Sequence, residues 1–291
     1  MASSKTAVKV GYDFPSNHPR AKFLHSAVAL SRKSAPVVMN PDNRIYPGAD
    51  TIGAVRSGTL DFGWINFCHL EGIAPNLAAF HAPFTLSDET MRTTEQRSRY
   101  LSEVNALLED TDFRICSVMR GADQIICTDR AIDPAGARFA GLALRVPGPG
   151  VYQRVISALG AKPILAPIST ALTLVESGEI GGAFTSPGAW QTLFKDQFPH
   201  VYHMKGLMMI TYVLLSRRSD ADTEWARLVR SAKMQCVTEK WEEMRLQDDE
   251  ILSTIATTTT DSYEVLEPTD REFRHLSLMP DRERSVTPFT P

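Results

Sequence analysis

The sequence lacks the features that mark membrane proteins and nucleic-acid-binding proteins. Its apolar runs never approach the ~20 residues that a membrane-spanning helix needs. It has no block of lysine and arginine, and 31 basic against 34 acidic residues give a formal net charge of −3, so we expect no nucleic-acid partner. Its first residues, MASSKTAVKVGYD, contain no apolar segment of the secretory-signal type. This pattern leaves either a cytoplasmic protein or a mature form with a replaced leader.

Motifs for metal binding, nucleophilic catalysis and nucleotide binding are also absent. The cysteines, Cys68, Cys116, Cys127 and Cys236, form neither a C-x-x-C pair nor metal-ligand spacing. Cys116 and Cys127 lie in apolar, strand-like runs, and we expect them to be buried as small hydrophobic side chains. His200 and His203 have no third ligand nearby. No G-x-S-x-G, G-x-G-x-x-G or Walker loop occurs. The sequence therefore predicts no metal and no cofactor.

What the sequence does contain is a regular alternation of short apolar strands and amphipathic helices. The alternation predicts an α/β fold with mostly parallel sheets and helices on both faces. One helix is expected from an N-cap at Ser87 to about Asp110. A second helical pattern, over residues 220–257, is long enough to lie across two lobes as a strut.

The stretch GLALRVPGPG, residues 141–150, ends an apolar strand with an arginine. In an extended chain Arg145 shares a face with Gly141 and Ala143, where small side chains leave room for another group. Pro147 stops the strand because it has no N–H to donate. Arginine's planar fork suits recognition of a buried carboxylate. The alternative is a salt bridge within the protein, to Asp123 or Asp133.

Other polar and aromatic residues follow the predicted strands at their carboxyl ends, where open α/β sheets bind ligands. The first half of the chain supplies Tyr12, Asp13, Asn66, Phe67 and His69, and the second half supplies Asp123, Arg145, Thr185 and Trp190.

In these residues the chain resembles the DctP-type solute receptors of tripartite ATP-independent periplasmic (TRAP) transporters. The resemblance covers about residues 7–218 and is carried by SGTLDFG, FHAPFTLSD, IDPAGARFAGLALRVPG, LGAKPILAPISTALTLVESGEIGGA and YVLLSRR. It implies a two-lobed, periplasmic-binding-protein-like (Venus flytrap) fold, with a ligand cleft between the lobes and a long helix bridging them. We expect lobe I at residues 1–121 and 211–249, and lobe II at residues 122–210 and 250–291.

The resemblance also implies a role for Arg145, which occupies the family's signature arginine and would grip an organic acid. The predicted ligand-binding set is Arg145, Asp13, Asn66, Phe67, His69, Asp123, Gly148, Ile168, Thr185, Trp190 and Met209. The chain departs from the family pattern at Thr170, where an acidic residue is usual, and at residues 181–184, GGAF in place of DG-x-E. These departures favour a ligand with one carboxylate.

The resemblance thus predicts a monomeric periplasmic receptor, not an enzyme, that delivers a small carboxylate ligand to the membrane permease of a TRAP transporter. An alternative is a cytoplasmic enzyme on the same scaffold, a decarboxylase or isomerase of small acids with Asp123 or His69 as its base. A cytoplasmic ligand-sensing module is a third possibility.

Overall fold

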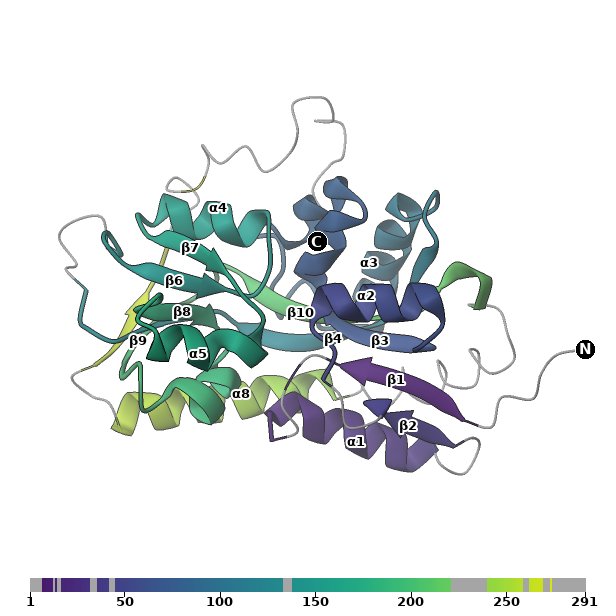
Figure 1. Ribbon diagram of the computed structural model, residues 1–291, viewed down its shortest axis with the longest axis horizontal. Coiled ribbons are helices and arrows are strands. Elements are labelled where there is room, and N and C mark those ends of the chain that lie inside the picture. The colour runs from purple at the N-terminus through teal and green to yellow at the C-terminus, as the bar shows by residue number, and fades with distance from the viewer. Residues whose placement is uncertain are drawn as a thin grey trace, which may run out of the picture.

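The computed structural model describes residues 7–12, 14, 17–31, 36–41, 45–132, 138–220, 240–258, 262–268 and 273. It contains two β-sheets side by side, each with helices packed around it (Figure 1). Each sheet with its helices forms one lobe, and we call the lobe with β1 the first lobe. The expected α/β, two-lobed fold is present.

The sheet of the first lobe has the strand order β2-β1-β3-β10-β4. Its strands are β1 (Val8–Tyr12), β2 (Val37–Met39), β3 (Phe62–Asn66), β4 (Phe113–Asp123) and β10 (Met209–Arg217). β1 runs parallel to β2 and β3, whereas β10 runs antiparallel to β3 and β4. The prediction of mostly parallel sheets was therefore too simple, because β10 returns from the other lobe in the opposite direction.

The sheet of the second lobe has the strand order β11-β9-β5-β8-β6-β7. Its strands are β5 (Ile125–Thr128), β6 (Ala143–Val146), β7 (Lys162–Leu165), β8 (Gly182–Thr185), β9 (His200–Met204) and β11 (Tyr263–Leu266). β6 is parallel to β7 and β8, and β5 is antiparallel to β8 and β9. This sheet is therefore mixed as well.

Helices and helical turns cover both sheets. The first lobe carries α1 (Pro19–Ser31), α2 (Gly48–Ser57), η2 (Phe67–Gly72), η3 (Pro75–His81), α3 (Thr94–Leu107) and η6 (Arg218–Asp220). The second lobe carries α4 (Val151–Ala158), η4 (Ile168–Thr170), α5 (Ala171–Glu176), α6 (Pro187–Ala189) and η5 (Trp190–Phe194). Of the helices in the described residues, none is long and apolar enough to cross a membrane.

One predicted helix begins later than expected. Residues Ser87–Met91 form turns, and α3 starts at Thr94. Thr93 and Gln96 form a capping box, in which each side chain bonds the other's backbone N–H, and this pair fixes the start of the helix. The Ser87 hydroxyl instead accepts a hydrogen bond from the Thr90 N–H within the preceding turn.

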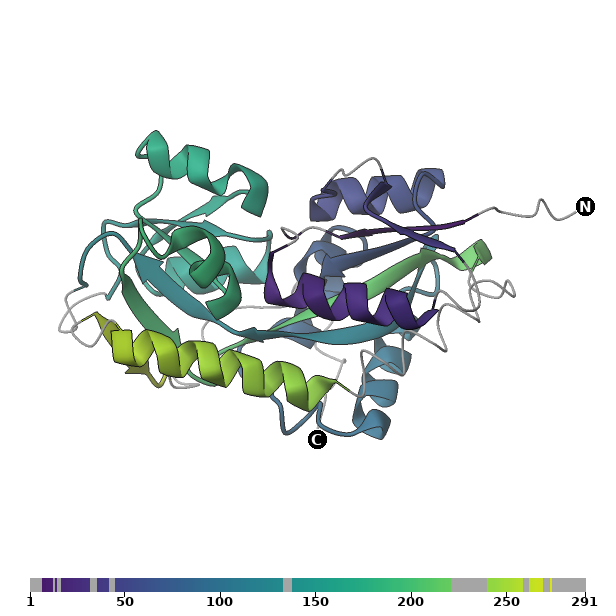
Figure 2. The ribbon, with the colours of Figure 1, turned by 90° about the horizontal axis from the view of Figure 1, so that it is seen from below.

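Within the described residues, three connections join the lobes. The chain passes directly from β4 into β5 and from β9 into β10, and α8 (Trp241–Thr258) contacts β4 of one lobe and α6 and β11 of the other. Figure 2 shows α8 lying along both lobes. The expected bridging helix is present over these residues, and residues 221–239 lie outside the described part of the chain. The exact lobe boundaries stay a prediction.

Buried apolar clusters fill both lobes, and three cysteines belong to them. Cys68, Cys116 and Cys127 are free and buried, as expected of Cys116 and Cys127, while Cys236 lies outside the described residues. Burial raises the pKa of the Cys127 thiol, so this side chain stays neutral and behaves as a small hydrophobic group.

Candidate ligand-binding cavity

A cavity of about 410 Å³ lies between the two lobes. The first lobe contributes Phe14, His18, Pro47, Gly48, Ala49, Asp50, Asn66, His69, Ile210 and Tyr212. The second lobe contributes Arg145, Pro147, Leu165, Pro167, Ile168, Ser169, Thr185, Ser186 and Ala189. The volume is in the range of sites that hold small molecules.

Arg145 reaches the cavity from the end of β6. Its neighbours in the sheet are Ala183 on β8 and Ile164 on β7. The side chain is only 4 % exposed, and its Nε donates a hydrogen bond to the carbonyl of Ala166 at 2.9 Å. This bond orients the guanidinium plane, so Arg145 holds its positive charge in a fixed position in the cavity wall.

Two histidines in the cavity wall are neutral at pH 7. Burial and the positive charge of Arg145, with a smaller effect of His81, lower the pKa of His69 to about 4. Burial and the neighbouring Arg20 lower the pKa of His18 to about 3. Among the described lining residues the remaining charges are therefore Arg145 and Asp50, which is exposed in the first turn of α2.

Several other predicted residues meet at this cavity. Asn66 ends β3, and its Oδ1 accepts a hydrogen bond from the Cys68 N–H at 3.2 Å, which starts η2. Thr185 ends β8 and is buried, and Ile168 begins η4. Together with His69 and Arg145, they border the cavity. Their roles as ligand contacts stay predictions.

The lobes approach closely around the cavity. A Cβ atom at Gly188 of the second lobe would lie 3.0 Å from Pro19 of the first. Within the first lobe, a Cβ atom at Gly48 would lie 2.0 Å from the His69 ring, so glycine allows this ring to pack on the start of α2.

Three predicted residues do not reach the cavity because their side chains pack in the core. The ring of Phe67 packs against His81 and Tyr100 in the first lobe. The Trp190 Nε1 donates a hydrogen bond to the Phe198 carbonyl at 2.8 Å within the second lobe. Met209 belongs to the apolar cluster of the first lobe.

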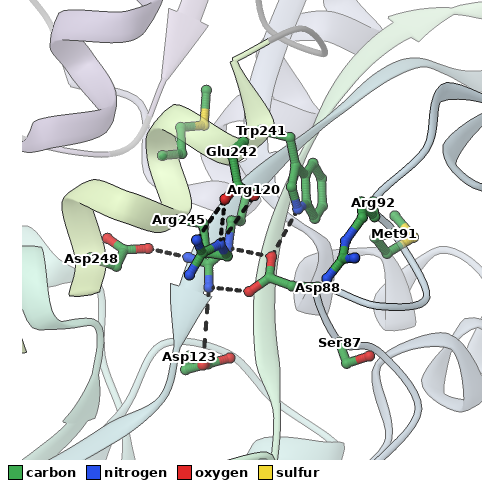
Figure 3. Close-up of polar contacts among 12 residues, drawn as sticks. Ser87, Asp88, Met91, Arg92, Arg120, Asp123, Trp241, Glu242, Arg245 and Asp248 are labelled. Atoms are coloured by element: carbon green, nitrogen blue, oxygen red, sulfur yellow. Dashed lines mark hydrogen bonds and ion pairs between the residues drawn. The ribbon is translucent and has the colours of Figure 1, made fainter.

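Asp123 also lies elsewhere. It is 4.0 Å from Arg120 (Figure 3). It borders a separate, solvent-open pocket together with Asp88, Arg92, Glu242, Arg245 and Asp249. Burial raises its pKa, while Arg120 lowers it. Asp13 and Asp133 lie outside the described residues.

Gly148 serves a packing role rather than lining the cavity. A Cβ atom there would lie 2.1 Å from the Cys68 sulfur of the first lobe. At the start of α4, the Val151 N–H donates to the Glu71 carboxylate at 3.1 Å. The protein's own carboxylate occupies that position.

Sequence reasoning missed several lining residues, among them Phe14, His18, Tyr212 and Ser186. Phe14 and Ser186 follow β1 and β8 directly, so the rule that ligands gather at strand ends applied to both. Tyr212 sits opposite Asn66 in the antiparallel β3–β10 pair. Its position depends on a pairing between segments far apart in sequence, which no local pattern reveals.

A cluster of buried charged side chains, separate from the cavity, holds α8 against the first lobe. This anchor cluster consists of Arg20, Asp88, Arg120, Trp241 and Asp248, most of it shown in Figure 3. Asp248 of α8 accepts hydrogen bonds from Arg20 at 2.5 Å and from Arg120. Arg120 donates twice to Asp88, at 2.7 Å each, and Trp241 donates to Asp88 at 2.8 Å. Burial raises the pKa of Asp248 to about 6, although both guanidinium groups lower it.

A family model for bacterial extracellular solute-binding proteins of family 7, the DctP family, matches residues 22–215. A TRAP periplasmic solute-binding protein from Xanthobacter autotrophicus with bound β-D-galacturonate is 18 % identical, with a TM-score of 0.77 and coverage of 94 % of this chain and 95 % of that one.

Two further solved structures have the same fold. An extracytoplasmic solute receptor from Bordetella pertussis binding pyroglutamic acid is 16 % identical, with a TM-score of 0.77 and coverage of 92 % and 91 % of the two chains. A TRAP periplasmic solute-binding protein from Sulfurospirillum deleyianum with bound succinate is 15 % identical, with a TM-score of 0.74 and coverage of 91 % and 89 %. At these identities the likeness extends to the fold.

Proposed function

Since the chain belongs to the DctP family of bacterial extracellular solute-binding proteins, we propose that it captures a small organic acid with Arg145 and delivers it to a TRAP membrane permease. The observation that carries the proposal is a buried guanidinium, oriented by the Ala166 carbonyl, in the wall of an inter-lobe cavity. The solved structures of the same fold hold galacturonate, pyroglutamic acid and succinate, all of them acids.

The described cavity wall favours a ligand with one carboxylate. Arg145 supplies one positive charge, while burial keeps His18 and His69 neutral at pH 7. The first turn of α2 also borders the cavity, and a helix N-terminus adds partial positive charge. A second carboxylate would find no further cation among the described lining residues.

The remainder of the wall suits an uncharged body with an apolar side. Phe14, Leu165, Ile168 and Tyr212 offer apolar and aromatic surface, while the polar groups of the wall include Asn66, Ser169, Thr185 and Ser186. Apolar surface contributes affinity, and a few placed hydroxyl and amide groups set orientation. We propose a hydroxy acid or a cyclic acid of modest size.

Closure of the lobes supplies both affinity and selectivity. Excluding water strengthens the bond between the guanidinium and the carboxylate. A ligand without the acid cannot form this charge-assisted pair with Arg145 and binds more weakly. For such a receptor we expect a dissociation constant in the micromolar range, which corresponds to a binding free energy of about −8 kcal/mol.

We further propose that the protein works as a monomer in the periplasm and does not turn its ligand over. The alternative enzyme needs a base beside the bound acid, and two residues were candidates. Asp123 borders the separate pocket beside α8. A base works best with a pKa near the operating pH, and the pKa of His69 is about 4. Neither residue suits the role.

The test is calorimetric titration of the ligand-free protein with D-galacturonate, D-glucuronate, pyroglutamate, orotate and succinate. We expect at least one acid to bind to the wild type, with affinity at least 100-fold weaker in Arg145→Met. Arg130→Met is the matched control, because Arg130 is an exposed arginine of the same lobe whose guanidinium bonds the Gly141 carbonyl. Equal binding by wild type and Arg145→Met would overturn the assignment.

A further inference from the structure

A glutamate of the first lobe reaches across to the second lobe outside the cavity. Glu71 lies in η2, and its side chain is 9 % exposed. Its Oε1 accepts the hydrogen bond from the Val151 N–H at 3.1 Å and lies 2.8 Å from Nε2 of His81. Its Oε2 lies 3.9 Å from Arg154 on α4. One carboxylate therefore contacts groups of both lobes.

The helix that Glu71 contacts has no N-cap side chain of its own. α4 begins at Val151, and its N-cap is Gly150, which has no side chain to accept a hydrogen bond from the first turn. The carboxylate of Glu71 takes that place and brings a negative charge to the positive end of the helix. The cap of a helix in one lobe is thus supplied by the other lobe.

The backbone before α4 is shaped to admit this carboxylate. A Cβ atom at Gly150 would lie 1.8 Å from the Glu71 Oε2, so a larger residue there would push the glutamate away. Gly150 also has φ +67°, which glycine adopts without strain. Nearby, the Tyr152 hydroxyl donates to Asn66 Oδ1 at 3.4 Å, and the rings of His81 and Tyr152 pack edge to face.

This contact is next to the ligand arginine in sequence. Residues 147–150 connect Arg145 and Val146 to α4, and Pro147 lines the cavity. Holding the start of α4 therefore holds the segment that leaves the binding site. The contact exists only when the two lobes are together, because its donor and acceptor lie on different lobes.

We propose that Glu71 is a positioning residue that caps α4 across the cleft and so stabilises the closed form with its binding segment in place. It touches no ligand and acts through α4. The inference rests on the proposed function in one respect, namely that closure of the lobes retains a bound ligand. The first experiment below tests the helix cap without any ligand.

The first experiment measures hydrogen exchange of the Val151 amide in the ligand-free protein. Glu71→Gln keeps the size of the side chain but removes its charge, and Glu71→Ala removes the acceptor. We expect exchange at Val151 to be roughly threefold faster in Glu71→Gln and roughly tenfold faster in Glu71→Ala, as for the loss of a helix cap. The matched control is Glu103→Gln, an exposed glutamate that pairs with Arg99 on α3.

Amides within α3 serve as the internal reference. Unchanged exchange at Val151 in both variants overturns the proposal. Faster exchange that includes α3 to the same extent also overturns it, because it reports general destabilisation rather than a lost cap. Faster exchange at Val151 with α3 unchanged supports it.

The second experiment measures rate constants by stopped-flow fluorescence with D-galacturonate, pyroglutamate and succinate. For any acid that binds, we expect Glu71→Ala to release it about tenfold faster, because the cap must break before the lobes open and the ligand leaves. An unchanged release rate contradicts the role in closure. If none of the acids binds, the proposed function fails, and the exchange at Val151 still decides whether Glu71 caps α4.

Discussion

Two regions of this protein bury arginines, and they use them differently. In the anchor cluster, Arg20 and Arg120 contact carboxylates that the chain itself supplies, Asp248 and Asp88. In the inter-lobe cavity, Arg145 takes its hydrogen bond at Nε to a backbone carbonyl and borders about 410 Å³ of space. The anchor cluster lies between the first lobe and α8, and the cavity lies between the two lobes.

The contrast separates the charges used for architecture from the one that we propose to hold a ligand. The anchor cluster joins α1, β4 and α8, and its partners are fixed by the fold. At the cavity, the nearest ionisable side chains include His69, whose pKa Arg145 helps to lower so that the histidine stays neutral.

The largest expected effect on stability comes from Asp248→Asn. The change removes the negative charge between the buried guanidinium groups of Arg20 and Arg120. Since both arginines stay charged, we expect this loss to outweigh the burial cost that raises the pKa of Asp248, and to lower the free energy of unfolding by about 3–5 kcal/mol. Chemical denaturation at pH 8, where Asp248 is ionised, measures it. The control is Asp249→Asn, since the neighbouring Asp249 forms an exposed pair with Arg245 that should contribute less than about 1 kcal/mol. Similar losses in both variants would mean that the anchor cluster contributes no more to stability than an exposed ion pair.

Arg145→Met should affect ligand binding, whereas Asp248→Asn should affect stability. We expect it to abolish the ligand-induced rise in melting temperature, which is worth about 2.7 kcal/mol for an acid present at 100 times its dissociation constant. Asp248→Asn should instead keep its affinity for the same acid within about threefold. Differential scanning fluorimetry of both variants, with and without the acid, makes the comparison. A loss of affinity in Asp248→Asn equal to that in Arg145→Met would remove the distinction between the two regions.

Trp241→Phe tests the anchor cluster more gently. The indole N–H donates to Asp88, and hydrogen bonds together with the charge of Arg120 lower the pKa of that carboxyl although burial raises it. Phenylalanine keeps most of the apolar packing and removes one hydrogen bond to a charged acceptor. We expect a loss of about 1.5 kcal/mol by chemical denaturation. An effect as large as that of Asp248→Asn would point to packing rather than to the hydrogen bond.

The alternation of strands and helices along the chain was enough to predict the fold class, because each element carries its own periodicity. It also placed β6 and Arg145, since Pro147 ends the strand two residues after the arginine. The mixed direction of the sheets was not predictable from the same evidence. β10 pairs with β3 and β4 across long separations in sequence, and local patterns do not report the direction of such pairs.

The candidate site was predictable where a residue lies at a strand end and its side chain faces the cleft. Asn66, Arg145 and Thr185 satisfy both conditions. Phe67 and Trp190 lie close to strand ends too, but their large apolar rings turn into the core. Glu71 gave no signal at all, because its role depends on a helix 80 residues further along the chain.

The smallest expected effect is a dependence of affinity on pH through His69. Its pKa of about 4 in the folded protein lies below its ordinary value of 6.5, so folding disfavours the protonated form, and stability falls as the pH drops from about 6.5 towards 4. A carboxylate bound near His69 favours the protonated form and raises this pKa. Binding then takes up protons, and we expect affinity to rise by less than about tenfold as the pH is lowered from 7.5 to 5.5.

Titration calorimetry in buffers of different ionisation enthalpy measures the proton uptake. The uptake should vanish in His69→Gln and persist in His200→Gln, because His200 lies outside the described cavity lining. If affinity instead falls as the pH is lowered from 7.5 to 5.5, no carboxylate lies beside His69. The acid would then not bind at Arg145 either.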